Sequence, residues 1–265
     1  MKIGVIHYNF PGYSFTDFLK YASETGYGYV ELSVGDVWGK GVDNPERKAE
    51  EVRKQVESSG LKVSALAAGN DFIVLEEKAI EAQVERMGRI CGLANILGTD
   101  VIRTEGGNPK DSVPKDRWVE AMAGCLTRCI DFAEKNDVYL AVDNHGHVTN
   151  DGDLQIELFQ RVGSDRVGAN MDTMNYRWAG HSLDKIAHFY EIVAPYTLHT
   201  HMKDGTGSLG EYRGAALGEG EIDLAYAVKC LRNAGYEGVW CSEYEGQEGS
   251  DVGYRKCFEW LKANL

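Results

Sequence analysis

The regular alternation of short apolar runs with amphipathic segments most constrains the fold of this chain. Eight β-branched or apolar runs recur, and most are separated by a stretch with the 3.6-residue period of a helix. This alternation predicts βα units around a parallel sheet. The predicted strands are Lys2–His7, Tyr29–Ser33, Lys62–Leu66, Asp100–Thr104, Val138–Asp143, Val167–Met171, Leu198–Met202 and Val239–Glu243. The predicted helices span residues 15–25, 46–59, 77–97, 114–136, 152–162, 183–193, 222–234 and 251–263.

Eight such units favour closure of the sheet. The 265 residues are enough for one large core, and no linker or shift of composition divides them. An open nucleotide-binding sheet would need a glycine-rich turn after the first strand, but residues 7–12 lack G-x-G-x-x-G, so no nucleotide cofactor is expected. We therefore predict a single (β/α)8 TIM barrel, with residues 1–265 as one domain. Glycines suited to helix C-caps mark its lower end: Gly26, Gly60, Gly98, Gly163 and Gly235.

Composition excludes several classes of partner. The net charge of −13 opposes nucleic-acid binding, which depends on clustered Lys and Arg. The chain shows no signal-peptide pattern and no apolar stretch long enough to cross a bilayer, so we expect a cytoplasmic protein without a membrane partner. The six cysteines lack C-x-x-C spacing and are expected to be reduced thiols.

Polar residues gather at the predicted C-terminal ends of the strands, where barrels of this kind build their active sites. Four of them, Asp143, Asp172, His201 and Glu243, end four successive strands and should converge near the barrel axis. Each alone has an ordinary explanation as a helix cap or a satisfied buried group. Together, three carboxylates and an imidazole predict a site for one divalent metal ion, with Mn²⁺ expected first and Mg²⁺, Co²⁺ or Zn²⁺ as alternatives.

Other residues at this end are candidates for binding substrate or moving protons. The candidates for substrate binding are His7, Glu31, Arg103, His199 and Arg213. His145 follows Asp143 by two residues and could act as a base near neutral pH, or could merely hydrogen-bond within its loop. Lys203 could contact a substrate oxygen or a developing negative charge, or could simply pair with Asp204.

The turn Gly218-Glu219-Gly220 has a glycine pattern compatible with phosphate binding, but Glu219 and the following Glu221 would repel phosphate. A turn that leads into a helix N-cap is the better interpretation.

Five segments carry a family resemblance that covers essentially the whole chain. They are Leu140–Gly146 (LAVDNHG), Gly168–Thr173 (GANMDT), His199–Asp204 (HTHMKD), Leu217–Asp223 (LGEGEID) and Trp240–Glu245 (WCSEYE). With these segments the chain resembles the xylose isomerase-like barrels, specifically the sugar phosphate isomerase/epimerase group. The resemblance implies that Asp143, Asp172, His201 and Glu243 are the metal ligands, that the first and last also transfer protons, and that the protein is a homo-oligomer.

The sequence departs from the family pattern at two positions. The strand-five ligand is usually glutamate, whereas Asp143 is one methylene shorter and reaches less far toward both a metal and a substrate carbon. Asn175 stands where ketose epimerases tend to have a histidine that touches substrate. The first departure puts epimerisation by two carboxylates in doubt, and the second argues against transferring the substrate specificity of those enzymes.

Four functions compete at this point. The leading hypothesis is a metal-dependent isomerase or epimerase that acts on a small sugar, keto-sugar or inosose through an enediolate, with Asp143, Glu243, His145 and Lys203 as catalytic residues. The alternative is a lyase or dehydratase of a keto-sugar or keto-glycoside, acting through the same enolate, with or without a partner subunit. DNA repair, known for endonucleases with the same barrel, is opposed by the negative charge. A non-enzymatic binding protein is opposed by the complete set of metal ligands.

Overall fold

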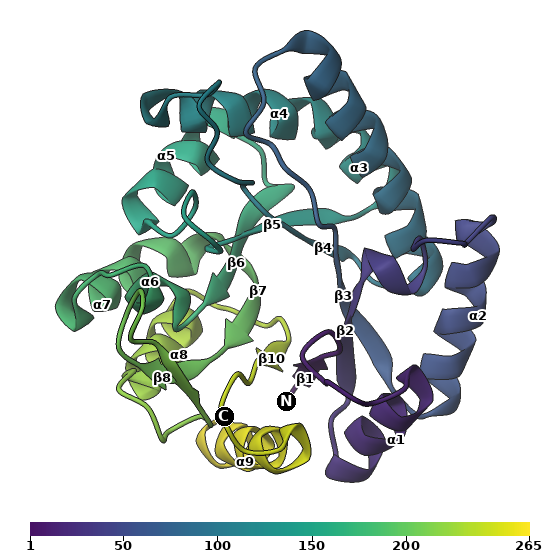
Figure 1. Ribbon diagram of the computed structural model, residues 1–265, viewed down its shortest axis with the longest axis vertical. Helices are drawn as coiled ribbons and strands as arrows, with labels where there is room; N and C mark the ends of the chain where they lie inside the picture. The colour runs from purple at the N-terminus through teal and green to yellow at the C-terminus, as the bar shows by residue number, and fades with distance from the viewer.

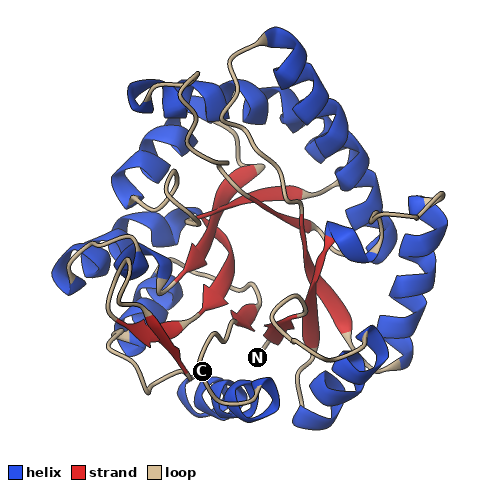
Figure 2. Cartoon of the chain, viewed as in Figure 1, coloured by secondary structure: helices blue, strands red, loops and turns tan.

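Eight parallel strands close into a barrel in the computed structural model, which describes residues 1–265. Figure 1 views the barrel from one end, with the helices outside the strands, and Figure 2 separates helices from strands by colour. The barrel strands are β1 (Ile3–Ile6), β2 (Tyr29–Ser33), β3 (Lys62–Ala67), β4 (Val101–Thr104), β5 (Tyr139–Asp143), β6 (Val167–Asp172), β7 (Thr197–Met202) and β10 (Trp240–Ser242). Hydrogen bonds between β1 and β10 close the ring, which confirms the predicted (β/α)8 barrel.

The helices form a ring outside the barrel (Figure 1). They are α1 (Phe15–Thr25), α2 (Pro45–Ser58), α3 (Glu77–Leu97), α4 (Trp118–Asn136), α5 (Gly152–Val162), α7 (Leu183–Val193), α8 (Leu224–Asn233) and α9 (Ser250–Asn264). Side chains cap several N-termini; for example, Ser14 accepts a hydrogen bond from the backbone N–H of Asp17. Gly26, Gly98 and Gly163 end α1, α3 and α5 in the left-handed conformation, as predicted for C-cap glycines.

The predicted strands all lie within one residue of the observed ends. The predicted helix over 114–136 begins later, because Pro114 leads into a short 3-10 helix at Lys115–Arg117 and α4 starts at Trp118. Three short elements lie where the sequence predicts neither a helix nor a strand: α6 (Asn175–Trp178) and the antiparallel hairpin of β8 (Asp204–Thr206) and β9 (Arg213–Ala215). These additional elements follow β6 and β7, so they lie at the C-terminal end of the barrel.

The main hydrophobic core fills the layer between the strands and the helices. A separate small cluster of Ala65, Val101 and Ala141, with Leu198 packed against it, comes from strands β3, β4, β5 and β7. Above this cluster the strand ends carry buried polar side chains, which supply the candidate active site. None of the helices combines the length and the apolar character needed to span a membrane.

Candidate active site

Asp172 ends β6 with one carboxylate oxygen fixed and the other free. Asn144 accepts the backbone N–H of Asp172 at 2.8 Å and donates to its carbonyl at 2.9 Å, which fixes the strand end. Oδ1 accepts backbone N–H groups from Met174 at 2.8 Å and from Asn175 at 2.7 Å, while buried Oδ2 has no hydrogen-bond partner. Burial, with a contribution from the carboxylate of Glu243, raises the pKa of Asp172 to about 7.

His201, on β7, lies between two carboxylates. Its Nε2 is 2.8 Å from Glu31 Oε2, and Tyr8 donates its hydroxyl to the other oxygen of Glu31 at 3.0 Å. Nδ1 lies 2.9 Å from Glu243 Oε2 but outside hydrogen-bond geometry, so this buried nitrogen is also unpartnered. Burial lowers the pKa of His201, but Glu31 and Glu243 together outweigh that effect and raise the pKa well above its ordinary value.

Lys203 places a positive charge beside the other oxygen of Glu243. Its ammonium is 2.9 Å from Glu243 Oε1, 2.9 Å from Glu245 Oε2 and 3.9 Å from Asp172 Oδ2. Tyr212, between β8 and β9, donates to the same oxygen of Glu245 at 2.9 Å. Burial raises the pKa of Glu243, but Lys203 and His201 outweigh it and hold the pKa well below its usual range. Glu243 is therefore an ionised carboxylate at neutral pH.

The side chains of Asp172, His201 and Glu243 together fit a divalent cation. One ligand atom from each lies within 4.8 Å of the others, and all three residues are buried. Asp172 Oδ2 accepts no hydrogen bond, and a buried polar atom without a hydrogen bond is costly, while His201 Nδ1 has only the Glu243 carboxylate beside it. Two carboxylates and one imidazole form a donor set suited to Mn²⁺ and related ions. Glu31 would then fix the orientation of the ligating ring from its other nitrogen.

Asp143 lies outside that group of three. Arg103 donates to Asp143 Oδ2 from Nε at 2.9 Å and also from Nη2, and Asn170 donates to Oδ1 at 2.8 Å. Although burial raises the pKa of Asp143, Arg103 outweighs burial and lowers it. His145 is about half exposed, and its Nδ1 lies 3.9 Å from Asp143 Oδ2. Both oxygens of the predicted fourth ligand are thus engaged within the protein.

A second possible cation cluster shares His201 with the first and adds Glu31 and His199. His199 Nδ1 is 2.8 Å from Asn170 Oδ1 and 3.5 Å from Glu31 Oε2, so its inner nitrogen already has partners. Burial lowers the pKa of His199 to about 4, which keeps the ring neutral. The first cluster fits an ion better, because its free atoms converge on one another.

The two remaining candidates for substrate binding lie farther out. His7 is held by Asp36, with Nδ1 3.1 Å from Oδ2, and its ring packs against Phe15 and Phe18. Arg213 is exposed on β9 and forms no ion pair. The role in substrate binding predicted for each stays a prediction.

The sequence analysis assigned no role to several polar residues that organise this end of the barrel: Tyr8, Asn144, Asn170, Tyr212 and Glu245. A usable signal existed for two of them. Asn144 and Asn170 lie next to or two residues before a predicted ligand, and amides there can hold carboxylates and backbone groups in place. Tyr8 and Tyr212 lie in loops, where the sequence alone does not show in which direction a side chain points.

The turn at Gly218–Gly220 is organised by Asp204 instead of phosphate. The buried Asp204 carboxylate accepts backbone N–H groups from Gly218 at 2.9 Å, Gly220 at 3.0 Å and Ile222 at 3.2 Å, as well as from Gly205 at 2.8 Å. The donors that would otherwise face an anion are therefore already engaged. This agrees with the expectation that the turn is not a phosphate site.

Comparison with known proteins places these residues in a family context. The family model described as xylose isomerase-like TIM barrel matches residues 19–264. No curated protein matches the chain. Among solved structures, the IolI protein with a binding zinc atom has a TM-score of 0.80 at 19% identity, covering 100% of this chain and 96% of that one.

Two further structures carry activities in their descriptions. D-psicose 3-epimerase in the presence of D-fructose has a TM-score of 0.79 at 16% identity, covering 100% of this chain and 99% of that one. A probable 3-DHS dehydratase, AsbF, from Bacillus anthracis has a TM-score of 0.74 at 14% identity, covering 99% of each chain. At these low identities the solved structures show only that the fold is shared. The family model, in contrast, matches most of the sequence and therefore shows the family. The chain belongs to the xylose isomerase-like TIM barrel family.

Proposed function

We propose that this protein is a divalent-metal-dependent isomerase or epimerase that acts on a small sugar, keto-sugar or inosose. The observation that carries the proposal is the convergence of Asp172 Oδ2, which is buried and accepts no hydrogen bond, with His201 Nδ1 and the ionised carboxylate of Glu243. We infer that these three residues hold the ion. Mn²⁺ is the expected metal from the donor set, and the zinc in the description of the IolI structure supports Zn²⁺ as an alternative.

The protein's own residues would position the reaction. A bound divalent ion would supply electrostatic stabilisation for negative charge that develops on a substrate oxygen when the adjacent carbon loses a proton. Glu31 holds the His201 ring through Nε2, and the N-terminus of α6 holds Asp172 through Oδ1. These contacts leave one defined atom of each residue to face the ion.

Glu243 and His145 are the residues best placed to move protons. Glu243 is ionised, and the Lys203 ammonium at 2.9 Å would stabilise charge on the same side of the site. His145 is accessible to solvent, whereas Asp143 has both oxygens engaged by Arg103 and Asn170. We therefore favour Glu243 with His145 as the pair that takes up and returns the proton.

A lyase or dehydratase is the second candidate, and the state of Asp143 supports it. Epimerisation needs a proton-transfer group on each face of the substrate carbon, but Arg103 and Asn170 engage both oxygens of Asp143, which leaves neither oxygen free to take up a proton. Elimination needs one base and an acid to protonate the leaving group. Glu243 could supply the base and the half-exposed imidazole of His145 the acid, while the Lys203 ammonium, 2.9 Å from Glu243, would stabilise the negative charge of the enolate.

Metal binding and proton exchange test the proposal together. The protein would be stripped with a chelator, reloaded with Mn²⁺, and assayed in D₂O against a panel of ketoses, inososes and 3-keto-glycosides. We expect stoichiometric metal and deuterium incorporation that is lost in Glu243→Gln, reduced in His145→Ala and retained in Glu219→Gln, a change at an exposed glutamate paired with Lys256.

The products then separate the two reactions. Deuterium in a product that has lost no group indicates isomerisation, whereas release of water or an aglycone indicates elimination. If no divalent ion binds to the stripped protein, the proposal is wrong for both reactions. A cytoplasmic location and a homo-oligomeric state remain expectations from the sequence.

A further inference from the structure

The ammonium group of Lys203 lies close to four side-chain oxygen atoms at the C-terminal end of the barrel. Its Nζ donates to Glu243 Oε1 at 2.9 Å and to Asn175 Oδ1 at 3.4 Å, and it forms an ion pair with Glu245 Oε2 at 2.9 Å. The fourth oxygen, Asp172 Oδ2, is 3.9 Å away, beyond hydrogen-bond distance. The three closer oxygens match the three N–H groups that an ammonium can offer.

The backbone of Lys203 is fixed, so only its side chain can change partners. The hydroxyl of Thr173 accepts the backbone N–H of Lys203 at 2.9 Å and donates to its carbonyl oxygen at 2.6 Å. The Lys203 side chain is 4% exposed, and a buried charge that loses one partner needs another. Asp172 Oδ2 accepts no hydrogen bond and lies within reach of a small side-chain movement.

The hairpin of β8 and β9 holds Glu245 beside Lys203. Tyr212 donates its hydroxyl to Glu245 Oε2 at 2.9 Å, the same oxygen that pairs with Lys203. Gly205 and Gly214 are paired across the hairpin. A Cβ at Gly205 would lie 2.8 Å from Tyr212 Cε2, and a Cβ at Gly214 would lie 2.4 Å from the carbonyl oxygen of Glu245. The two glycines therefore let the hairpin approach Glu245 closely.

Tyr212 matters because Glu245 is near the surface. The Glu245 side chain is 36% exposed, whereas those of Lys203 and Asp172 are 4% and 0% exposed. An exposed carboxylate pays side-chain entropy to stay in one place, so an ion pair with it is weak unless other contacts hold it. The Tyr212 hydroxyl supplies such a contact.

Lys203 and a divalent ion would compete for Asp172 Oδ2. An ammonium that moved to this oxygen would occupy a proposed ligand atom and place a positive charge beside the ion. In the structure the ammonium lies instead at Glu243 Oε1, while Glu243 Oε2 lies 2.9 Å from His201 Nδ1. The side of Glu243 that faces the proposed metal position is therefore clear of Lys203.

We propose that Glu245 and Tyr212 are positioning residues, which hold the Lys203 ammonium away from Asp172 Oδ2 and so keep that oxygen free for a divalent ion. This role rests on the proposed function, because it takes Asp172 as a metal ligand. Each of the two residues acts on the ion only through Lys203. Their loss should therefore weaken metal binding, and the effect should require the ammonium.

Calorimetric titration of the chelator-stripped protein with Mn²⁺ tests this role without measuring activity. We expect Glu245→Ala to weaken Mn²⁺ binding by roughly 10- to 100-fold, as is typical of residues that support a metal ligand. Tyr212→Phe should weaken it by about two- to tenfold, the loss expected for one hydrogen bond.

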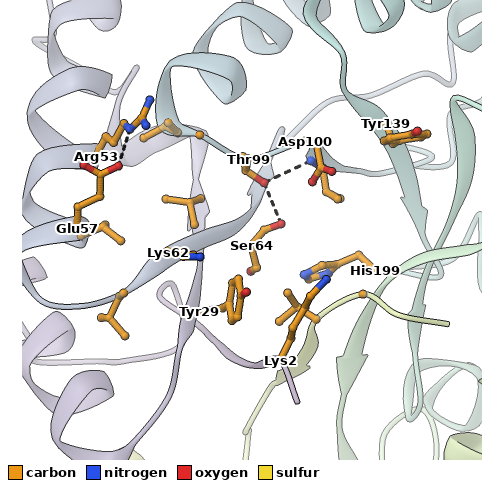
Figure 3. A pocket seen from close by; sticks show the side chains of 18 of the residues that line it. Lys2, Tyr29, Arg53, Glu57, Lys62, Ser64, Thr99, Asp100, Tyr139 and His199 are labelled. Carbon is orange, nitrogen blue, oxygen red and sulfur yellow. Dashed lines mark hydrogen bonds and ion pairs between the residues drawn. The ribbon is translucent and has the colours of Figure 1, made fainter. Parts of the chain in front are cut away.

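A glutamate at the other end of the barrel supplies a matched control. Figure 3 shows Glu57 paired with Arg53 beside a cavity of about 730 Å³, where Arg53 Nε donates to Glu57 at 2.8 Å. Glu57→Ala removes the same charge and also breaks an ion pair, but Lys203 does not line that cavity. Its affinity for Mn²⁺ should equal that of the wild type.

The dependence on Lys203 separates positioning from a general structural effect. In a Lys203→Met background, Glu245→Ala should change Mn²⁺ affinity by less than about twofold, because the competing ammonium is gone. A crystal structure of metal-free Glu245→Ala should show Lys203 Nζ within hydrogen-bond distance of Asp172 Oδ2. This second measurement decides the matter even if the Lys203→Met variants do not fold.

Two results would overturn the proposal: wild-type Mn²⁺ affinity in Glu245→Ala, or an equal loss of affinity with and without Lys203. A Lys203 side chain that stays in place in the crystal structure of Glu245→Ala would also contradict it. In each case the wild type would still bind Mn²⁺, so the proposed function would stand. If the wild type bound no divalent ion, the proposed function would fail first and this role would fail with it.

Discussion

Two neighbouring aspartates, Asp143 and Asp172, end adjacent strands but have different partners. Arg103 and Asn170 engage both oxygens of Asp143. Asp172 has one oxygen fixed by backbone N–H groups and the other without a partner. A ligand that must first leave a buried guanidinium contributes less binding energy to a metal than one that is already free. The two carboxylates should therefore differ in their contribution to metal affinity.

Measurements of metal affinity test this difference between Asp143 and Asp172. We expect Asp172→Asn to weaken Mn²⁺ binding by more than the roughly 10- to 100-fold loss typical of residues that only support a ligand. Asp143→Asn should cost no more than that roughly 10- to 100-fold, because Asp143 would act on the site only through its neighbours Arg103 and Asn170. Calorimetric titration of the chelator-stripped protein would measure both, with Asp36→Asn, beside His7, as the control.

An equally large loss in Asp143→Asn would show that Asp143 leaves Arg103 when the ion binds. In that case the four-ligand set predicted from the sequence would be correct. A loss in Asp36→Asn as well would indicate a general effect on folding.

Among the segments that connect the elements, the turn between β9 and α8 depends on one buried carboxylate. Asp204 binds backbone N–H groups on both sides of Gly220. A Cβ atom at Gly220 would lie 2.1 Å from Asp204 Oδ1 and 2.5 Å from the backbone nitrogen of Gly205. Neither neighbour can move without breaking the hydrogen bonds that define the turn.

We expect Gly220→Ala to destabilise the protein by about 1–3 kcal/mol, the usual range for a substitution that breaks buried packing or hydrogen bonds. Amide hydrogen exchange of Gly218 and Ile222 should accelerate, because both donate to Asp204. Gly124→Ala is the control: Gly124 lies within α4, and a Cβ there meets nothing within 4 Å. It should stabilise α4 by up to about 1 kcal/mol. Unchanged exchange in Gly220→Ala would mean that Asp204 does not organise the turn.

The sequence predicts the long elements well and the short ones poorly, for a physical reason. A strand such as β2 or a helix such as α3 buries a periodic face, and the period is visible in the chain. The hairpin β8–β9 has three residues in each strand, and α6 has four residues in all, too few to show a period. These elements are fixed by contacts with distant residues, such as Tyr212 with Glu245.

The same limit applies to the site. The positions of Asp172, His201 and Glu243 at one end of the barrel follow from strand order alone. The pairing of Arg103 with Asp143 depends on which side chains of two adjacent strands share a level, and their register is a tertiary property. The sequence thus predicts which residues reach this end of the barrel, but it does not predict which hydrogen-bond partners each carboxylate oxygen has.

For the whole molecule, buried cysteine thiols should make the free energy of unfolding depend on pH in the alkaline range. Cys91 lies in α3, Cys125 lies in α4 and Cys257 lies in α9, and all three are buried and reduced. Burial raises the pKa of each to about 12, with the largest contribution from loss of solvent. In the unfolded chain these thiols would ionise near their ordinary pKa of about 8.5.

The sign of the pH effect follows from proton binding. Between about pH 9 and 12 the folded protein keeps protons on these thiols that the unfolded chain has lost, so the free energy of unfolding must fall as pH rises. Each such thiol contributes a slope of about 1.4 kcal/mol per pH unit. Urea unfolding at several pH values should show a shallower decline for the Cys91→Ala/Cys125→Ala double variant than for the wild type. Cys230→Ala, at a half-buried position, should change the slope less. Equal slopes in all three proteins would mean that the buried thiols do not govern alkaline stability, because their protons would then be lost equally in the folded and unfolded states.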